Sequence, residues 1–295
     1  MISVDKSWID ILLKIPGLPE HDQKTLGQLV GKQPGGMGGN VACGASRLGL
    51  RTGMVSWVGD DADGQLVLDD LRRFGVDTSH VKVESDTTTN FTTVLIDATG
   101  EKAIVIVPTA FDTLVLDPPL TEYLHNTRLV YCAAYDPAQL AQIAEVGRAS
   151  GALICTDIEP AAGLQDETFS QVLSLVDIAF IDAKTVATDD YDQLAQELRA
   201  AGPRVVIMSF GAEGALACDA QGVTHCPAFT VPVIDTTGAG DCFAAAFLTA
   251  YLRHSPLDQA LRYASAAAAL SIQGYGARGA LPTHEEVQAF LASNQ

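Results

Sequence analysis

The middle of the chain alternates between short apolar runs and longer segments with helical periodicity. The apolar runs have the composition of buried strands: LVYCAA, ALICTDI, IAFID and RVVIMSF. The segments between them repeat their apolar residues on one helical face: AQLAQIAEVGRAS, ETFSQVLSLV and DQLAQELRAAG. Strands that alternate with helices predict a mostly parallel sheet covered by helices on both faces, which is an α/β fold with three layers.

The N-terminal third begins the same alternation with a helix. Residues 40–49 (NVACGASRLG) have the pattern of a helix, with Asn40 as its N-cap and Gly49 as its stop. The segment TGMVSWVGDD then predicts a strand, and GQLVLDDLRRFG predicts a second helix that ends at Gly75. This part of the chain therefore belongs to the same layered fold.

Two segments do not fit the alternation. The runs FTTVLID (91–97) and KAIVIV (102–107) flank the short segment ATGE, which predicts a β-hairpin. The first 35 residues contain short extended pieces interrupted by prolines at positions 16, 19 and 34. We expect these segments to form a small accessory sheet over one edge of the main sheet.

A glycine-rich segment late in the chain points to chemistry. DTTGAGD (235–241) lies between FTVPVI, which predicts a strand, and DCFAAAFLTAYL, which predicts a long apolar helix. In α/β sheets, ligands bind where such strand-to-helix loops emerge beyond the carboxyl ends of the strands. Gly238, Ala239 and Gly240 leave their backbone N–H groups uncovered, and a helix N-terminus adds partial positive charge. The segment therefore predicts an anion site.

Asp241 closes this segment with a negative charge. A carboxylate beside an anion site repels a phosphate, unless the carboxylate takes the proton of an attacking hydroxyl. Phosphoryl transfer requires that combination of donors for the transferred oxygens and a base for the nucleophile. The alternative interpretation makes Asp241 a helix N-cap and the glycines a tight turn.

Composition narrows the class of protein. The chain has 295 residues, 47% of them hydrophobic, which suits a globular domain with a substantial core. Its net charge of −18 argues against nucleic acid as a partner, because binding to phosphates requires basic surface. The six cysteines form no CxxC pair, which favours reduced, buried thiols. The N-terminus lacks a signal-like apolar core and no run is long enough to span a membrane, so we expect a cytoplasmic protein.

Other motifs give weak or no signals. The Walker A pattern GxxxxGK[ST] is absent, which excludes a P-loop kinase. GYGARG (274–279) matches GxGxxG, but it follows the last long helix instead of opening an early βαβ unit. The six histidines show no metal-binding spacing.

Two stretches together are characteristic of one family. GGMGGNVACGASRLG (35–49) and DTTGAGDCF (235–243) resemble the two signatures of the ribokinase-like (PfkB) carbohydrate kinase family. VGDDADG (58–64), SFGAEG (209–214) and GARGALPTHEEV (276–287) match further segments in the family's order. The matches cover nearly the whole chain. The resemblance implies one ribokinase-like α/β domain over residues 1–295, with three layers, a mostly parallel central sheet and a small β lid.

The resemblance also implies an activity, the phosphorylation of a sugar or nucleoside hydroxyl with ATP and Mg²⁺. Asp241 would be the general base, and Gly238, Ala239 and Gly240 the anion hole. The sugar site would be formed by Asp5, Gly35, Gly36, Gly39 and Asn40. Two alternatives stay open: Asn40 as a plain N-cap and Asp5 as a solvated aspartate.

The remaining functional positions follow from the same resemblance. Ser209, Gly211 and Gly214 would cradle the ATP phosphates and ribose, with a simple hairpin turn as the alternative. Ser265 stands where the family has its adenine-side residue. A monovalent-cation site, for K⁺, would involve Asp235, Thr237, Ser271, Gly274, Gly276 and Ala280. Segments near 9–33 and 88–110 would form the lid, which often carries the dimer contact in relatives.

Three departures from the family pattern bear on these expectations. The first departure is the short N-terminus. Residues 1–4 are either all that remains of a central strand, or the start of the sequence is truncated. Where relatives have an NxxE motif that helps to organise Mg²⁺ through water, Asp182 replaces Asn and Thr185 replaces Glu. Asp182, or Asp157 and Glu159, would substitute. The serine at 265 replaces the family's Asn or His.

Three rival functions stay open. A nucleoside kinase would need a sugar pocket that also admits a base. A catalytically silent sugar- or nucleotide-binding relative would fit the loss of NxxE, although such a protein has no use for the base Asp241. A dinucleotide-dependent oxidoreductase would rest on GYGARG alone. The sequence does not name the sugar, whose recognition would depend on side chains such as Lys6, Lys14, Asn90, Thr92, Pro108 and Tyr135.

Overall fold

A nine-stranded sheet forms the centre of the protein, in a computed structural model that describes residues 1–98, 102–109, 114–132, 137–158, 167–186 and 188–294. Its strand order is β13-β12-β11-β10-β9-β8-β1-β4-β5. The seven strands from β11 to β5 run parallel, and β12 and β13 return antiparallel at one edge. The strands are β1 (Ile2–Val4), β4 (Gly53–Gly59), β5 (Asp77–Glu84), β8 (Leu129–Cys132), β9 (Leu153–Ile158), β10 (Ile178–Asp182), β11 (Val205–Ser209), β12 (Ala215–Asp219) and β13 (Gly222–Cys226).

The inner strands are apolar throughout because both of their faces are covered. Along β10, Ile178 and Phe180 belong to one hydrophobic cluster, while Ala179 and Ile181 belong to another. Side chains alternate across a strand, so a continuous apolar run fills two cores, one on each side of the sheet. This confirms the predicted three-layer α/β fold.

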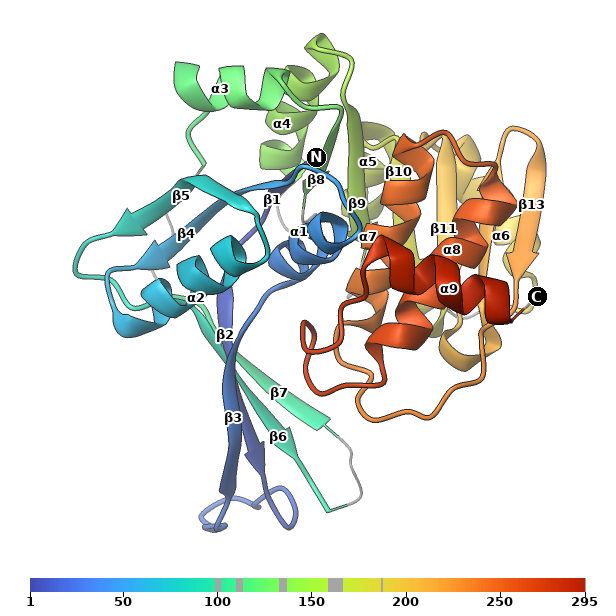
Figure 1. Ribbon diagram of the computed structural model, residues 1–295. Helices are drawn as coiled ribbons and strands as arrows, with labels where there is room; N and C mark the ends of the chain where they lie inside the picture. The colour runs from blue at the N-terminus through green and yellow to red at the C-terminus, as the bar shows by residue number, and fades with distance from the viewer. Residues whose placement is uncertain (99–101, 110–113, 133–136, 159–166, 187, 295) are drawn as a thin grey trace.

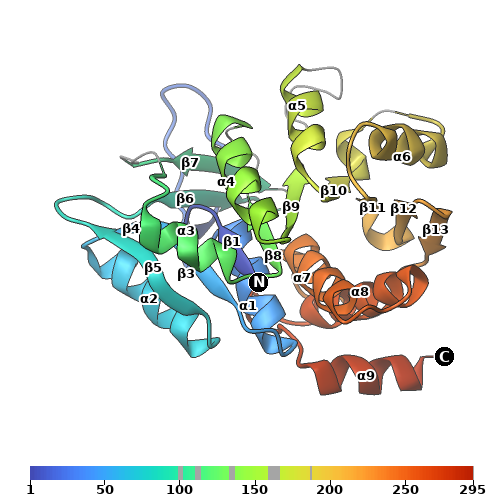
Figure 2. The same ribbon diagram turned by 90° about the horizontal axis from the view of Figure 1, so that it is seen from above.

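Two groups of helices cover the two faces (Figure 2). One face carries α1 (Met37–Arg47), α2 (Ala62–Arg73), α7 (Ala239–Leu252), α8 (Leu257–Ser271) and α9 (His284–Ser293). The other carries α3 (Pro118–His125), α4 (Pro137–Ala149), α5 (Glu167–Leu175) and α6 (Tyr191–Ala200). None of the described helices is long and apolar enough to cross a membrane.

A separate four-stranded sheet forms the lid and extends away from the main body (Figure 1). Its order is β3-β2-β6-β7, with β2 (Trp8–Lys14), β3 (Gln28–Gly35), β6 (Phe91–Ile96) and β7 (Lys102–Val107). β6 pairs antiparallel with β7, as the predicted hairpin requires, while β2 pairs parallel with β6 and joins the two predicted lid segments. The accessory sheet is therefore confirmed.

Two predicted elements differ from the structure: the start of one helix and the presence of one strand. The helix expected at 40–49 begins at Met37 with Gly36 as its N-cap, so Asn40 lies inside its first turns and does not cap it. Residues 229–234 form no strand: Pro232 has no N–H donor, and the amides of Ile234 and Asp235 donate instead to the carbonyl of Ile272. The apolar run at 229–234 therefore does not belong to the sheet.

The short N-terminal strand lies inside the sheet. β1 pairs in parallel with β4 on one side and β8 on the other, over Ile2, Ser3 and Val4. Three residues thus suffice to form an interior strand, third from the β5 edge. They deliver Asp5 to the carboxyl end of the strand, where ligands bind in sheets of this type.

Candidate active site

A cavity of about 440 Å³ lies beyond the carboxyl ends of β9, β10 and β11. Asp157, Asp182 and Ser209, from the ends of these three strands, line it together with the first turn of α7. Met37 of α1 and Ile104 of the lid strand β7 complete the wall. The structure thus brings the predicted base, the anion hole, Asp182 and Ser209 into one space.

The first turn of α7 has a backbone that requires glycine. Gly238 is the N-cap, with a φ of +74° in the left-handed region, and a Cβ there would lie 2.5 Å from the Cβ of Ala277. A Cβ on Gly240 would meet nothing within 4 Å, so this residue leaves open space beside the cavity. The Ala239 amide already donates to the carbonyl of Thr236 at 3.2 Å. The N–H group of Ala239, one of the three expected anion-hole residues, is therefore already used in part by a hydrogen bond within the protein.

Asp241 does not cap α7. The helix has no side-chain cap, and Asp241 lies in its first turn, where Asn40 Nδ2 donates to Asp241 Oδ2 at 2.7 Å. The two residues meet because α1 and α7 pack closely: a Cβ on Gly44 would lie 2.9 Å from the Cβ of Ala245. The N-cap interpretation of Asp241 was wrong, and so was the one that made Asn40 only a cap.

Asn40 is itself held by an arginine that the sequence analysis did not single out. Arg278 Nε donates to Asn40 Oδ1 at 2.8 Å, and only 8% of Arg278 is exposed. The nearby signal was GARGALPTHEEV (276–287), which matched the family without pointing to this side chain. Buried arginines are rare unless paired, so a lone Arg amid small residues is the clue that could have found it.

Asp5 is buried beside the N-terminus of α1. Its carboxylate accepts from Lys6 N at 2.6 Å and from Gly38 N at 2.7 Å, and the residue is 5% exposed. Burial, and to a lesser extent the charge of Asp241, raises the pKa of Asp5 to about 7 against the opposing effect of the two backbone donors. The solvated-aspartate interpretation was therefore wrong.

Gly38 makes this burial possible. A Cβ there would overlap the Cβ of Asp5 and lie 2.7 Å from Ser3 Oγ. A Cβ on any of the three predicted sugar-site glycines would likewise meet a polar group. On Gly35 it would overlap the carboxylate of Asp10, on Gly36 it would lie 2.9 Å from Lys6 O, and on Gly39 it would lie 2.5 Å from Arg278 Nη2. None of these glycines lines the 440 Å³ cavity, and neither do Asp5 and Asn40. Asn40 connects this group to the cavity through its hydrogen bond to Asp241.

The segment SFGAEG connects two antiparallel strands. Phe210 N donates to Gly214 O at 2.8 Å, and Ser209 pairs with Ala215, so the segment is the turn of the β11–β12 hairpin. Gly211 and Gly214 both have positive φ, +59° and +111°. The hairpin interpretation is correct as geometry, and it still leaves Ser209 on the cavity wall.

Two further predicted positions flank this turn. Asp182 Oδ1 accepts from Lys184 N at 3.0 Å and caps a short 3₁₀ turn, and the Lys184 ammonium lies 3.7 Å from the position of a Cβ on Gly211. Ser265 in α8 is buried and donates to Cys226 Sγ at 3.6 Å, close to the end of β13. The sequence analysis did not single out Lys184, although it lies within the segment that replaces NxxE.

The expected cation-binding residues are neighbours in part. Asp235 Oδ1 accepts from the N–H and hydroxyl of Thr237, and its Oδ2 accepts from Gly276 N at 2.9 Å. Gly274 lies against Ala280, whose Cβ would be 2.6 Å from a Cβ on Gly274. The Ser271 hydroxyl instead donates to Ala268 O in its own helix. The described residues contain no group of three or more His, Cys, Asp or Glu side chains that could hold a metal.

The model of the pfkB family of carbohydrate kinases matches residues 1–284. The chain belongs to this family. The kinase is 30% identical over 286 residues to the ATP-dependent ribose-1-phosphate kinase of Halopiger xanaduensis, covering 96% of this chain and 95% of that protein. It is 28% identical over 303 residues to the nucleoside kinase of Methanothermobacter thermautotrophicus, covering 99% and 96%.

A solved structure shows the same fold. The Arabidopsis thaliana ribokinase complexed with ribose and ATP superposes with a TM-score of 0.86, at 24% identity, over 98% of this chain and 97% of that one. The kinase therefore has the ribokinase-like fold, including the small lid sheet.

Several residues expected to recognise the sugar are occupied within the lid. Asn90 Nδ2 donates to Ser7 O, and Thr109 donates to Asn90 Oδ1 through both its N–H and its hydroxyl. Thr92 donates to the carboxylate of Asp10. Tyr135 and Glu159 lie outside the described residues. In the described part of the lid, Ile104 is the residue that lines the cavity.

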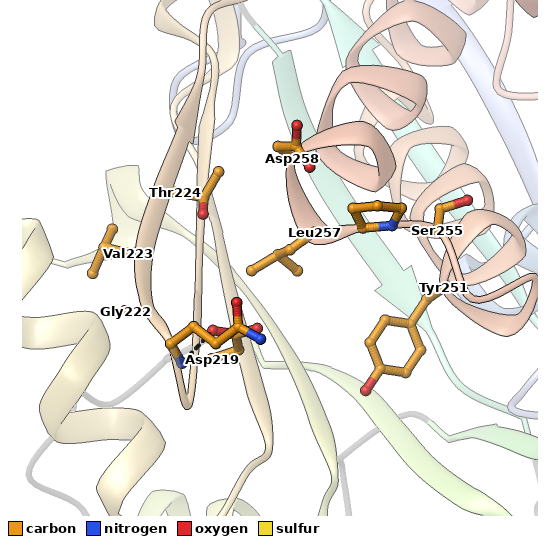
Figure 3. Close-up of a pocket in the computed structure, with 10 residues that line it drawn as sticks. Asp219, Gly222, Val223, Thr224, Tyr251, Ser255, Leu257 and Asp258 are labelled. Atoms are coloured by element: carbon orange, nitrogen blue, oxygen red, sulfur yellow. Dashed lines mark hydrogen bonds between the residues drawn. The ribbon is translucent and has the colours of Figure 1, made fainter.

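Another cavity, of about 530 Å³, lies at the far end of α7 (Figure 3). Asp219 and Thr224 of the β12–β13 hairpin face Tyr251, Leu257 and Asp258 of the α7–α8 junction across it. It contains none of the residues of the two signature stretches. GYGARG also takes no dinucleotide-binding form, because it follows α8 as a loop with no strand before it.

Proposed function

We propose that this kinase transfers the γ-phosphate of ATP to a hydroxyl, in particular a hydroxymethyl group, of a small carbohydrate, with Asp241 as general base. The observation that carries the proposal is the placement of Asp241. Asp241 lines a cavity at the N-terminus of α7, and its carboxylate is held by Asn40 Nδ2 at 2.7 Å. A base is useful there only if an acceptor hydroxyl must lose a proton beside an anion-binding helix end.

The residues of the acceptor side divide the work. Asp241 accepts the proton of the attacking hydroxyl, and the N–H groups of the first turn of α7, with Gly238 and Gly240 foremost, bind the transferred oxygens. Asp5, with Gly35, Gly36, Gly39 and Asn40, binds the other hydroxyls of the acceptor. An ionised Asp5 accepts hydrogen bonds from two hydroxyls, whereas its protonated form must donate one.

The nucleotide side is assigned to Ser209 on the cavity wall and to the β11–β12 turn that follows it. Ser209, Gly211 and Gly214 cradle the phosphates, Lys184 adds a cation beside Gly211, and Ser265 lies on the adenine side. Asp182 and Asp157 both line the cavity and would hold Mg²⁺ there through water. The ion would supply positive charge to the phosphates.

The acceptor is best sought among pentoses and their derivatives. The similarity to a ribose-1-phosphate kinase and a nucleoside kinase, at 30% and 28% identity, favours a ribose unit that carries a phosphate or a base as the second candidate acceptor. ADP formation should therefore be measured with free pentoses and hexoses, sugar 1-phosphates and nucleosides. If no acceptor leads to ADP formation but an added sugar or nucleoside still raises the Tm, the protein would instead be a catalytically silent binding protein.

Two further features belong to this proposal. The lid exposes Val105 and Leu29, with exposed fractions of 53% and 62%, on the face opposite Ile104, and a second copy of the chain would cover such a surface. Sedimentation velocity would show a dimer, and a charged substitution at Val105 would dissociate it. The contact between residues 235–237 and 274–280 supports a K⁺ site formed by backbone carbonyls, which is tested by replacing K⁺ with Na⁺ in the assay.

A further inference from the structure

Arg278 is fixed by partners from three different elements. Its Nε donates to Asn40 Oδ1 in α1 at 2.8 Å, its Nη1 to Asp70 Oδ2 in α2 at 2.6 Å, and its Nη2 to the carbonyl of Gly35 at the end of β3 at 3.0 Å. The side chain is 6% exposed. A guanidinium is planar and its donors form a rigid fork, so these bonds fix its position and its plane.

This arrangement determines which way the Asn40 carboxamide points. Arg278 can only donate, so the atom of Asn40 that faces it must be the acceptor Oδ1. The amide nitrogen then faces Asp241, where Nδ2 donates to Oδ2 at 2.7 Å. A flipped carboxamide would set donor against donor at Arg278 and acceptor against acceptor at Asp241. Asn40 therefore has one satisfied orientation.

We propose that Arg278 is a positioning residue of the kinase: it orients Asn40, and Asn40 holds the carboxylate of Asp241 for proton transfer. The proposal rests on the proposed role of Asp241 as base. Arg278 does not line the cavity and touches no reacting atom. Its effect passes through Asn40, over the hydrogen bonds Asp70–Arg278–Asn40–Asp241.

The same side chain connects the lid to the base. Gly35, whose carbonyl accepts from Arg278, is the last residue of the lid strand β3 and directly precedes the N-cap of α1. Gln33 of the same strand lies against Gly276, two residues before Arg278. A movement of β3 would therefore act on the guanidinium that orients Asn40.

The first test compares two arginines that share one carboxylate. Arg278→Met removes the donors of Arg278 and keeps an unbranched side chain. Arg73→Met is the control: the Arg73 side chain is 69% exposed, and its guanidinium contacts the other carboxylate oxygen of Asp70. We expect Arg278→Met to lower kcat about 10- to 100-fold, as misplaced catalytic groups do, with the KM for ATP changed less than about twofold. Arg73→Met should leave kcat within about twofold.

A double-mutant cycle separates positioning from general structural damage. If Arg278 acts through Asn40, the loss of kcat in Arg278→Met should largely disappear when Asn40→Ala is already present. The reductions in Tm should also be less than additive, because the two side chains are hydrogen-bonded to each other, so the test is read from kcat. Multiplicative effects on kcat in the double variant, or an unchanged kcat in a folded Arg278→Met protein, would overturn the proposal.

Arg278→Lys keeps the inference testable if the methionine variant does not fold. Lysine retains a charge beside Asp70 but lacks the fork that reaches Asn40, Asp70 and Gly35 together. We expect the Tm of Arg278→Lys to lie within a few degrees of the wild-type Tm, and its kcat to lie between those of wild type and Arg278→Met. A folded lysine variant with wild-type kcat contradicts the proposal. Failure of the proposed function has a different signature, because wild-type protein would then form no ADP with any acceptor.

Discussion

The two walls of the active site are built in different ways. The acceptor wall consists of Asp241, which lines the cavity, and of the buried side chains that hold it, which come from distant parts of the chain and are joined by hydrogen bonds such as Asn40–Asp241 and Arg278–Asn40. The nucleotide wall consists of strand ends and a hairpin turn whose shape comes from positive φ at Gly211 and Gly214. Residues 211–213 of that turn are exposed.

This difference separates two requirements of the proposed reaction. The acceptor must be placed to within a fraction of an ångström of a base, which favours a rigid network of side chains. A nucleotide phosphate chain presents many equivalent oxygens, and backbone amides with one mobile cation can bind it without such a network. Substitutions on the acceptor wall should therefore affect kcat and stability strongly, and those on the nucleotide wall should affect mainly the KM for ATP.

The sharpest break in this comparison is Asp241→Asn. Asparagine retains the size of the side chain and its contact with α1 but cannot accept a proton, so we expect kcat to fall about 10²- to 10⁴-fold. The affinity for ATP, measured by calorimetry without acceptor, should stay within about threefold. Wild-type turnover in the folded variant would refute the assignment of the base.

Asp5 adds a pH dependence to the acceptor wall. Its folded-state pKa of about 7 exceeds its ordinary value of 3.8, so the folded protein binds the extra proton between these values. The free energy of unfolding contributed by this group therefore falls as pH rises from about 4 to 7, by on the order of 4 kcal/mol. Measured by urea unfolding, the stability of Asp5→Asn relative to wild type should improve by a comparable amount between pH 4 and pH 8.

The same group should control acceptor binding in the opposite sense. The ionised carboxylate binds two hydroxyls better than the acid does, so the KM for the acceptor should fall as pH rises through 7. Asp241 and Lys6 are the charged groups that act on Asp5, and neither is changed in the Asp5→Asn variant. That variant should show a high KM with little pH dependence over this range. An unchanged pH profile would place another group in this role.

A pair of glycines compares the two walls directly. Gly38→Ala puts a Cβ onto Asp5 and 2.7 Å from Ser3 Oγ, both buried, so we expect a loss of about 1–3 kcal/mol in stability and a higher KM for the acceptor. Gly211→Ala meets its nearest atom, Lys184 Nζ, at 3.7 Å and is strained only by its φ of +59°. It should cost about 1–2 kcal/mol and raise the KM for ATP alone. Equal effects on both KM values in both variants would remove the distinction between the walls.

The sequence predicted the layers, the lid hairpin and the segment around Asp241 because each depends on local pattern or on a contiguous motif. It missed the start of α1 because Gly36, a residue without a side-chain cap, takes the N-cap position ahead of Asn40. The strand expected at 229–234 failed because an apolar run with Pro232 can equally cross a surface. Arg278 and Asn40 are 238 residues apart, and no local pattern reports a contact that only the packing of α1 against the 276–280 loop creates.

The smallest expected effect concerns Lys184 on the nucleotide wall. Its ammonium is exposed and lies beside Gly211, so a contact with a phosphate there is charge-assisted but well solvated. Lys184→Met should raise the KM for ATP about three- to tenfold with kcat and Tm unchanged. Lys82→Met makes the same change of charge on β5, away from the cavity, and should leave the KM for ATP unaltered. If both variants raise that KM equally, the effect is one of net charge in a protein of −18, and Lys184 does not contact the nucleotide.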